Sequence, residues 1–250
     1  MWNYIIYNND TFEKIKEIAN NSIDLIITDP PYWVNFQNAW YDDSKEYVFS
    51  KLDYLFKEFK RIVKQWSHIY IFIPTLEAEK WIAVWKKYLK FNNLLATKAF
   101  KTNVCKANNN FWHNLQLVMY LSKWEPKEFY QVNWIKTSES RLTDPRNKNP
   151  KKFTYKYPNY IPEYIRSTAF DSKFHPNEKN INFLSNLVKL SSKEWDVIFD
   201  PFMWSWTTGL ASLYLNRKFI WIEQNNMYIE ISKNRISNLN LKLKKINHGS

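Results

Sequence analysis

The stretch Ile23–Tyr32, which reads I-D-L-I-I-T-D-P-P-Y, constrains the fold of this chain more than any other. Its first half is a short apolar run rich in β-branched residues, which predicts a strand. Because the apolar residues are continuous rather than alternating, we expect this strand to be buried on both faces of a parallel sheet. Pro30 and Pro31 cannot donate backbone hydrogen bonds, so the strand must stop and leave Asp29 at its carboxyl end. Ligands bind at that edge of open α/β sheets, so we expect Asp29 to face a binding crevice.

The rest of the chain alternates strand-like and helix-like patterns, which predicts an α/β fold with a βαβ unit near each end. Residues 33–43 show no period and are expected to form a loop over the crevice. The expected strands are 3–7, 23–28, 69–73, 94–100, 115–121, 197–199 and 219–222, and the expected helices are 11–20, 46–64, 77–89, 181–190, 207–215 and 228–239.

Length, hydropathy and charge narrow the class of protein. A chain of 250 residues can hold one α/β domain with a modest insertion. It has no run of eighteen apolar residues and no signal-like start, so we expect a soluble cytoplasmic protein with no membrane partner. The single cysteine, Cys105, excludes an intramolecular disulfide framework. The formal net charge of +12 indicates a polyanionic partner such as nucleic acid, although a merely solvated basic surface is an alternative.

The segment T-D-P-P-Y resembles the catalytic motif of the DNA amino-methyltransferases, which methylate adenine N6 or cytosine N4 with S-adenosyl-L-methionine. The resemblance implies a catalytic role for Asp29, Pro30, Pro31 and Tyr32. D-P-P-Y, as against S-P-P-Y, favours adenine N6, and cytosine N4 remains the alternative of the same class. N-P-P-Y would have favoured an RNA or protein methyltransferase, which is a further alternative. A plain Asp-Pro-Pro turn is the simplest non-functional interpretation.

A second segment, D-P-F-M-W-S-W-T-T, resembles the cofactor motif of the same family, D-P-F-x-G-S-G-T-T. Glu223 in K-F-I-W-I-E follows about twenty residues later, in the place of the acid that binds the ribose hydroxyls. The resemblance implies that the cofactor is S-adenosyl-L-methionine and that this turn binds it through Asp200, Pro201, Phe202, Trp204, Ser205, Trp206, Thr207 and Thr208.

Two further groups of residues resemble segments that contact the cofactor in this family. His175 and Lys179 stand in H-P-N-E-K, which resembles H-P-x-x-K-P, with Asn180 departing at the last position. In the family this segment closes over the methionine part of the cofactor, although His175 alone could be an ordinary helix-entry residue. Asp10 follows the first expected strand and resembles the acid that contacts the adenine of the cofactor. Asp10 followed by Glu13 also fits a helix cap, which is the alternative.

The catalytic motif precedes a variable region and the cofactor motifs follow it, which is the order of the β group of these enzymes. That order implies a circularly permuted, Rossmann-like methyltransferase sheet. We expect residues 1–122 and 175–250 to form the catalytic domain, and 123–174 to form the target-recognition region. The latter interleaves basic and aromatic residues, which suits double-stranded DNA, although a solvated connector with an aromatic minicore is an alternative. A restriction endonuclease partner and a homodimer are also considered.

Glycine and tryptophan counts are abnormal. The chain has 2 glycines and 13 tryptophans, whereas an average chain of this length has roughly 17 glycines. Tryptophan stands at expected turns or family glycine positions at residues 33, 66, 195, 204, 206 and 221. A tight turn beside a ligand needs positive φ and a close backbone approach, so an indole at 204 or 206 should clash with the cofactor or fill its place.

We hypothesise that a recoded codon explains these tryptophans. UGA is a stop codon in the standard code, but it is read as tryptophan in some bacterial codes and as glycine in a few bacterial lineages. UGA also differs by one base from the glycine codon GGA. Most of these tryptophans would then be native glycines. The alternative is a genuinely tryptophan-rich chain, and therefore a non-catalytic relic that still binds DNA.

Overall fold

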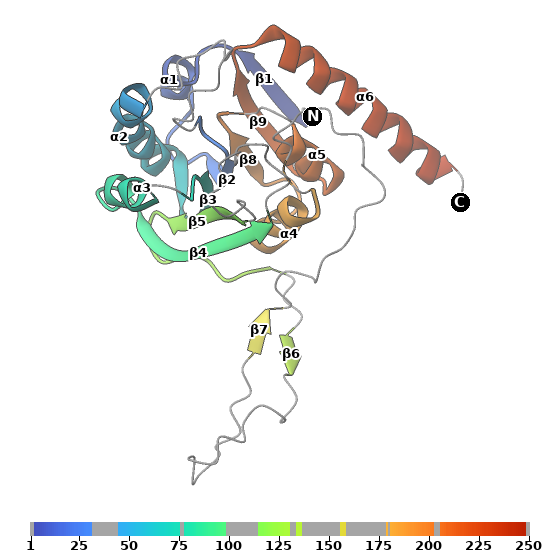
Figure 1. The fold of residues 1–250 in the computed structure, drawn as a ribbon. Coiled ribbons are helices and arrows are strands. Elements are labelled where there is room, and N and C mark those ends of the chain that lie inside the picture. The colour runs from blue at the N-terminus through green and yellow to red at the C-terminus, as the bar shows by residue number, and fades with distance from the viewer. Residues whose placement is uncertain are drawn as a thin grey trace, which may run out of the picture.

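A single seven-stranded sheet organises the molecule (Figure 1). The structure is a computed structural model that describes residues 3–31, 45–75, 78–98, 115–130, 134–136, 156–158, 179, 181–202 and 206–248. The strand order is β1 (Tyr4–Asn8), β9 (Lys218–Glu223), β8 (Val197–Asp200), β2 (Ile23–Thr28), β3 (Val63–Ile73), β5 (Leu115–Ser122) and β4 (Lys90–Lys98).

Strand β2 lies at the centre of the sheet, between β8 and β3, and all six of its residues are buried. This confirms the expectation from its continuous apolar sequence. Strands β1, β9, β8, β2 and β3 run parallel to one another, so their carboxyl ends meet at one edge. Strand β5 is antiparallel to β3 and β4, so β5 begins at that same edge.

Helices cover both faces of the sheet and give three layers (Figure 1). One core contains Ile15, Leu52 and Trp81, and the other contains Leu184 and Leu210. None of the helices in the described ranges has both the length and the apolar character needed to cross a bilayer. The first face carries α1 (Thr11–Lys14), the 3-10 helix η1 (Ile15–Glu17), α2 (Lys45–Ile62) and α3 (Ala78–Trp85), and the second carries α4 (Ile181–Ser191), α5 (Thr207–Tyr214) and α6 (Asn226–His248).

The first expected βαβ unit differs from the observed topology. Strands β1 and β2 do not pair, because β9 and β8 from the end of the chain lie between them. Each inserted strand pairs in parallel with its neighbours, for example Tyr4 with Phe219 and Leu25 with Ile198. Two strands from the end of the chain are therefore inserted between two strands from its beginning, as the expected circular permutation requires.

Several element boundaries also differ from the sequence expectation. The first helix is only one turn of α-helix, continued as 3-10 helix to Glu17. Helix α2 ends at Ile62, because Val63 already pairs with Ile23 as the first residue of β3. Long-range strand pairing here overrides the helical spacing of the apolar residues. Helix α6 is longer than expected and extends to His248.

The expected recognition region is described only at 123–130, 134–136 and 156–158. Strands β6 (Trp134–Lys136) and β7 (Lys156–Pro158) pair with each other in a separate antiparallel sheet (Figure 1). The preceding segment lies against the main body, since Lys127 N–H donates to the Trp66 carbonyl at 3.1 Å. The division into a catalytic domain and a recognition region stays a prediction.

Candidate active site

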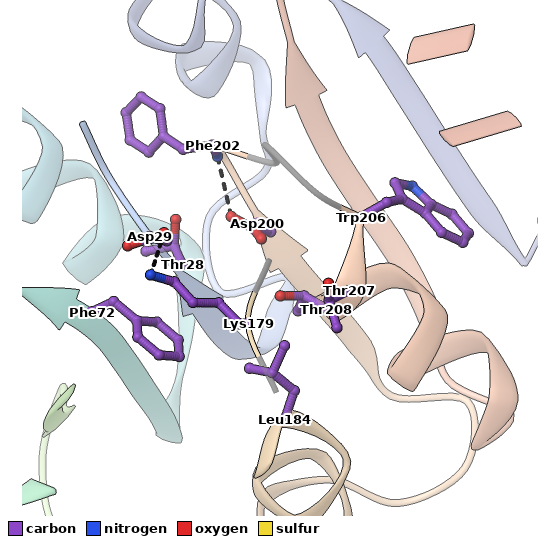
Figure 2. Close-up of a pocket in the computed structure, with 10 residues that line it drawn as sticks. All are labelled: Thr28, Asp29, Phe72, Lys179, Leu184, Asp200, Phe202, Trp206, Thr207 and Thr208. Atoms are coloured by element: carbon purple, nitrogen blue, oxygen red, sulfur yellow. Dashed lines mark hydrogen bonds and ion pairs between the residues drawn. The ribbon is translucent and has the colours of Figure 1, made fainter. Parts of the chain in front are cut away.

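Four predicted acidic residues follow neighbouring parallel strands. Asp29 comes directly after β2, Asp200 ends β8, Glu223 ends β9, and Asp10 follows β1. Because these strands are adjacent and parallel, all four residues lie along one edge of the sheet. A pocket at this edge is lined by Thr28, Asp29, Phe72, Lys179, Leu184, Asp200, Phe202, Trp206, Thr207 and Thr208 (Figure 2).

The pocket joins a predicted catalytic residue to a predicted cofactor residue. Lys179 Nζ lies 2.8 Å from Asp29 Oδ2, and the two side chains are only 17% and 16% exposed. Figure 2 shows this ion pair between the end of β2 and the segment that precedes α4. The ammonium group also lies 4.8 Å from the centre of the Phe72 ring, close enough for a cation–π contact.

Asp200 and Glu223 are buried carboxyl groups whose pKa values are raised towards neutral pH. Burial, with a smaller contribution from the neighbouring Asp29 carboxylate, raises the pKa of Asp200 to about 7. Burial likewise raises the pKa of Glu223 to about 7, with a contribution from Asp200. Backbone N–H groups oppose these shifts, since Phe202 donates to Asp200 at 3.1 Å and Asn225 donates to Glu223 at 2.8 Å.

The turn after β8 is held by the first helix. The Thr11 hydroxyl donates to the Pro201 carbonyl at 2.5 Å, and the Phe202 ring packs against Phe12 with centroids 6.0 Å apart. These contacts fix the backbone that follows Asp200. Two of the predicted cofactor residues are thus positioned by residues of α1.

Asp10 is the N-cap of α1. Its carboxylate accepts hydrogen bonds from the N–H groups of Phe12 at 2.8 Å and Glu13 at 3.1 Å. The predicted capping role is confirmed, and the contact with the adenine of a cofactor stays a prediction. Neither Asp10 nor Glu223 is among the described residues that line the pocket.

Trp206 has the left-handed backbone predicted for a glycine turn, and it lines the pocket while its side chain is buried. Its φ is 64° and its ψ 9°, which is left-handed, at the N-cap of α5. The indole is fully buried and contacts Trp221 with ring centroids 5.1 Å apart. Figure 2 shows the ring pointing away from Asp29 and Asp200. The indole thus packs into the core beside α5, and a clash between residue 206 and a bound cofactor stays a prediction.

The other unusual tryptophans fall into two groups. Trp195 has a left-handed φ of 70°, as a glycine turn would. Trp66 instead lies within β3, so the expectation of a turn is wrong there, whereas Trp221 lies within β9, as the strand expected over 219–222 predicts. The predicted residues that lie outside the described ranges are Tyr32, Trp33, His175, Trp204 and Ser205.

The structure adds two residues at this site that the sequence did not predict, one in the pocket and one beside it. Phe72 lies near the carboxyl end of β3, beside β2, so the rule of strand ends could have identified it. Gln116 contacts Lys179 from the start of β5. That contact depends on the antiparallel direction of β5, which the local sequence pattern does not encode.

An open sheet with acidic residues at the carboxyl ends of its parallel strands defines an α/β protein of the ligand-binding, doubly wound class. Its family follows from comparison with known sequences. The profile of the DNA methylase family that covers the N6 and N4 enzymes matches residues 23–234, and this chain belongs to that family.

Two curated relatives align over nearly the whole chain. DNA adenine methyltransferase YhdJ of Escherichia coli K12 is 28% identical over 247 residues, which cover 92% of this chain and 82% of the relative. Type II methyltransferase M2.MboI of Moraxella bovis is 25% identical over 254 residues, which cover 93% and 87%. The similarity therefore spans the chain and is not confined to short motifs.

Solved structures share the fold. The M1.HpyAVI–SAM complex superposes with a TM-score of 0.62 at 20% identity, covering 93% of this chain and 99% of that chain. The PvuII DNA methyltransferase, described as cytosine-N4-specific, superposes with a TM-score of 0.66 at 16% identity, covering 99% and 94%. The predicted Rossmann-like methyltransferase fold is confirmed.

Proposed function

We propose that this protein transfers a methyl group from S-adenosyl-L-methionine to the N6 amino group of adenine in double-stranded DNA. The position of Asp29 carries the proposal. This residue follows the buried central strand β2, precedes Pro30 and Pro31, and shares a pocket with Asp200. Membership of the DNA methylase family and the similarity to a relative named DNA adenine methyltransferase support it.

The proposed chemistry explains why an acid and a rigid turn are needed together. The target amine lies inside a duplex and its lone pair is delocalised, so the base must be flipped out and its nitrogen activated. The Asp29 carboxylate and the Pro30 carbonyl accept the hydrogens of the amine and hold the nitrogen in line for transfer. Tyr32, outside the described residues, stacks on the flipped base and contributes roughly 1–3 kcal/mol.

The residues at the strand ends fit S-adenosyl-L-methionine in chemical type. The cofactor supplies an electrophilic methyl group on a sulfonium cation, and a cation is favoured beside the carboxyl groups of Asp29 and Asp200. Glu223 accepts hydrogen bonds from the ribose hydroxyls, and Asp10 contacts the adenine. The further proposed contacts are His175, Lys179, Pro201, Phe202, Ser205, Thr207, Thr208 and residues 204 and 206.

Cytosine N4 is the second candidate target. The support for it is the shared fold with the PvuII enzyme, which is described as cytosine-N4-specific. The D-P-P-Y motif favours adenine over cytosine, and it also disfavours RNA and protein substrates. A restriction endonuclease partner and a homodimer are additional proposals, and they are tested by co-purification and by the mass in solution.

We also propose that glycine is the native residue at several tryptophan positions. Trp195 and Trp206 have left-handed backbones, which residues of this size rarely adopt. The indole N–H groups of Trp206 and Trp221 are buried and have no hydrogen-bond partner among the described residues. An unsatisfied buried donor costs about 1–3 kcal/mol. Glycine at these positions would remove both penalties.

The gene sequence at codons 33, 204, 206 and 221 tests this proposal. UGA codons support it, and a chain with glycine restored at these positions is then expected to bind the cofactor and methylate DNA. UGG at all four positions means that the tryptophans are genuine. If the chain with genuine tryptophans then binds DNA but does not bind the cofactor, it is the non-catalytic relic.

A substrate competition tests the proposed function itself. Duplex DNA, RNA and protein compete for labelled methyl from S-adenosyl-L-methionine, with the printed and the glycine-restored chains assayed in parallel. We expect label in DNA, abolished by Asp29→Ala, with cofactor affinity changed by no more than a few-fold. Asp53→Ala is the matched control, because Asp53 pairs with Lys87 on the surface. Label in RNA or protein, or full turnover in Asp29→Ala, would contradict the proposal.

A further inference from the structure

We propose that Gln116 and Lys179 form a positioning relay that holds the Asp29 carboxylate for methyl transfer. The inference rests on the proposed catalytic role of Asp29. Lys179 Nζ lies 2.8 Å from Asp29 Oδ2 and 3.4 Å from Gln116 Oε1. The ammonium group thus joins the acid after β2 to a side chain at the start of β5, across the intervening strand β3.

The orientation of the Gln116 amide is fixed by the backbone. Its Nε2 donates to the Ile73 carbonyl at 2.8 Å and to the Leu117 carbonyl at 3.3 Å. A carbonyl oxygen only accepts hydrogen bonds, so the amide nitrogen must face these two groups. The amide oxygen consequently faces Lys179, as an acceptor for its ammonium group.

The ring of Phe72 supports the same lysine. Its centroid is 4.8 Å from Lys179 Nζ, so the ammonium group has a carboxylate, an amide oxygen and an aromatic face around it. Both members of the Lys179–Asp29 pair are largely buried, which strengthens their attraction relative to an exposed surface pair. These contacts restrict rotation of the carboxylate.

Orientation of Asp29 bears directly on rate. A carboxylate that must accept hydrogens from the target amine works only at the correct angle and distance, and an error of about 1 Å can cost about 100-fold in rate. Lys179 and Gln116 therefore act through Asp29, and they are positioning residues. This role differs from closure over the cofactor, which is what the family resemblance implies for Lys179.

The test separates turnover from cofactor binding. Variants are made in whichever parent chain methylates DNA, printed or glycine-restored, and kcat is measured at saturating DNA and cofactor. We expect Lys179→Met to lower kcat about 10- to 100-fold and Gln116→Leu about 3- to 10-fold. We expect cofactor Kd by calorimetry to change by less than about threefold in Gln116→Leu, whereas in Lys179→Met it also reports the loss of the proposed cofactor contact of that lysine. Lys179→Arg should recover part of the kcat, because it retains a cation for Asp29.

Asn92→Leu is the matched control for lost stability. Asn92 Nδ2 donates to Ser122 Oγ at 2.9 Å and so ties β4 to the opposite end of β5. This variant loses a similar side-chain hydrogen bond to β5, but far from Asp29, so kcat should be unchanged. Thermal unfolding of all variants shows how much stability each has lost.

Three outcomes would overturn the relay. An unchanged kcat in Gln116→Leu would show that the amide does not act on Asp29. A raised cofactor Kd with unchanged kcat in Lys179→Met would make the lysine a cofactor ligand only. An equal loss of kcat in Asn92→Leu and Gln116→Leu would indicate lost stability. By contrast, turnover retained in Asp29→Ala, or absent from both parent chains, would refute the proposed function on which the relay rests.

Discussion

At the scale of single residues, backbone conformation separates two kinds of unusual tryptophan. Trp195 and Trp206 share the left-handed region with Asn21 and Asn216. Asparagine tolerates this region through local hydrogen bonds, whereas a large side chain does not. Trp221 lies in a strand with an ordinary backbone, and what is unusual about it is its buried indole.

Trp195 gives the clearest test of backbone strain. It is the third residue of the turn Lys193–Asp196, which is closed by Asp196 N–H donating to the Lys193 carbonyl at 3.2 Å. The side chain is 54% exposed, so little packing is lost on removing it. We expect Trp195→Gly to stabilise the protein by about 1 kcal/mol, measured by urea unfolding. Trp195→Ala keeps the strained φ and should show no gain, so equal stability of the two variants would contradict the account.

The two buried acids predict that cofactor binding depends on pH. With a pKa of about 7, Asp200 and Glu223 hold protons at pH 6 that they have largely lost by pH 8. The ionised forms attract a sulfonium cation and accept stronger hydrogen bonds. Affinity for S-adenosyl-L-methionine should therefore rise at least about fivefold from pH 6 to 8, with proton release on binding near pH 6.5. Calorimetry in buffers of different ionisation enthalpy measures both, and a flat Kd would contradict the proposed roles.

At the scale of elements, the short helix α1 tests the two roles of Asp10. Its carboxylate caps the helix, and removing such a cap costs about 1 kcal/mol. Asp10→Asn keeps a capping oxygen but loses the charge. We expect Asp10→Ala to be destabilised by about 1 kcal/mol and Asp10→Asn to be nearly unaffected. If Asp10 also contacts the cofactor, both variants bind it more weakly. Unchanged cofactor affinity in both variants would mean that Asp10 only caps the helix.

A second element-scale contact ties β3, α4 and the segment after β5 together through His68. Its Nε2–H donates to the Lys127 carbonyl at 2.9 Å, because a carbonyl can only accept. Nδ1 therefore accepts from the Ser191 hydroxyl at 2.8 Å, and Ser191 Oγ accepts from the Tyr70 hydroxyl at 2.8 Å. Burial lowers the pKa of His68 to about 4, so the folded protein keeps this ring neutral.

This network predicts acid sensitivity. The pKa of His68 is about 4 in the folded protein and 6.5 for an ordinary histidine, so its stabilising contribution is complete above pH 6.5 and is lost as the pH falls towards 4. The full effect on the free energy of unfolding is about 3 kcal/mol. The side chain in the variant His68→Gln does not titrate between pH 7 and pH 4. The free energy of unfolding of this variant, relative to the parent, should therefore rise by about 3 kcal/mol from pH 7 to pH 4. Parallel stability curves would contradict the prediction.

At the scale of the whole molecule, the sequence predicted where the parallel strands end better than it predicted which strands lie side by side. Asp29, Asp200 and Glu223 could be placed at one sheet edge because apolar runs, prolines and acids mark the ends of parallel strands. The separation of β1 from β2 could not be predicted, since pairing between distant segments leaves no local period. The Lys179–Asp29 and Lys179–Gln116 contacts were missed for the same reason.

The side chains of the tryptophans show a different limit. The left-handed turns at residues 195 and 206 follow from motif position. The direction of the Trp206 indole, however, depends on space beside α5, where it meets Trp221, which in turn packs against Phe219. Packing of this kind joins the turn before α5 to strand β9, so a local sequence pattern could not give it.

The central claim is methyl transfer to adenine N6 of DNA through Asp29. The most direct measurement is mass spectrometry of nucleosides from duplex DNA treated with the methylating parent chain and isotopically labelled S-adenosyl-L-methionine. Asp29→Ala is run in parallel. We expect labelled N6-methyladenine with the parent chain and none with the variant. Labelled N4-methylcytosine would contradict the claim, and so would labelled N6-methyladenine from the Asp29→Ala variant. The claim would also fail if neither the printed nor the glycine-restored chain gave a labelled nucleoside.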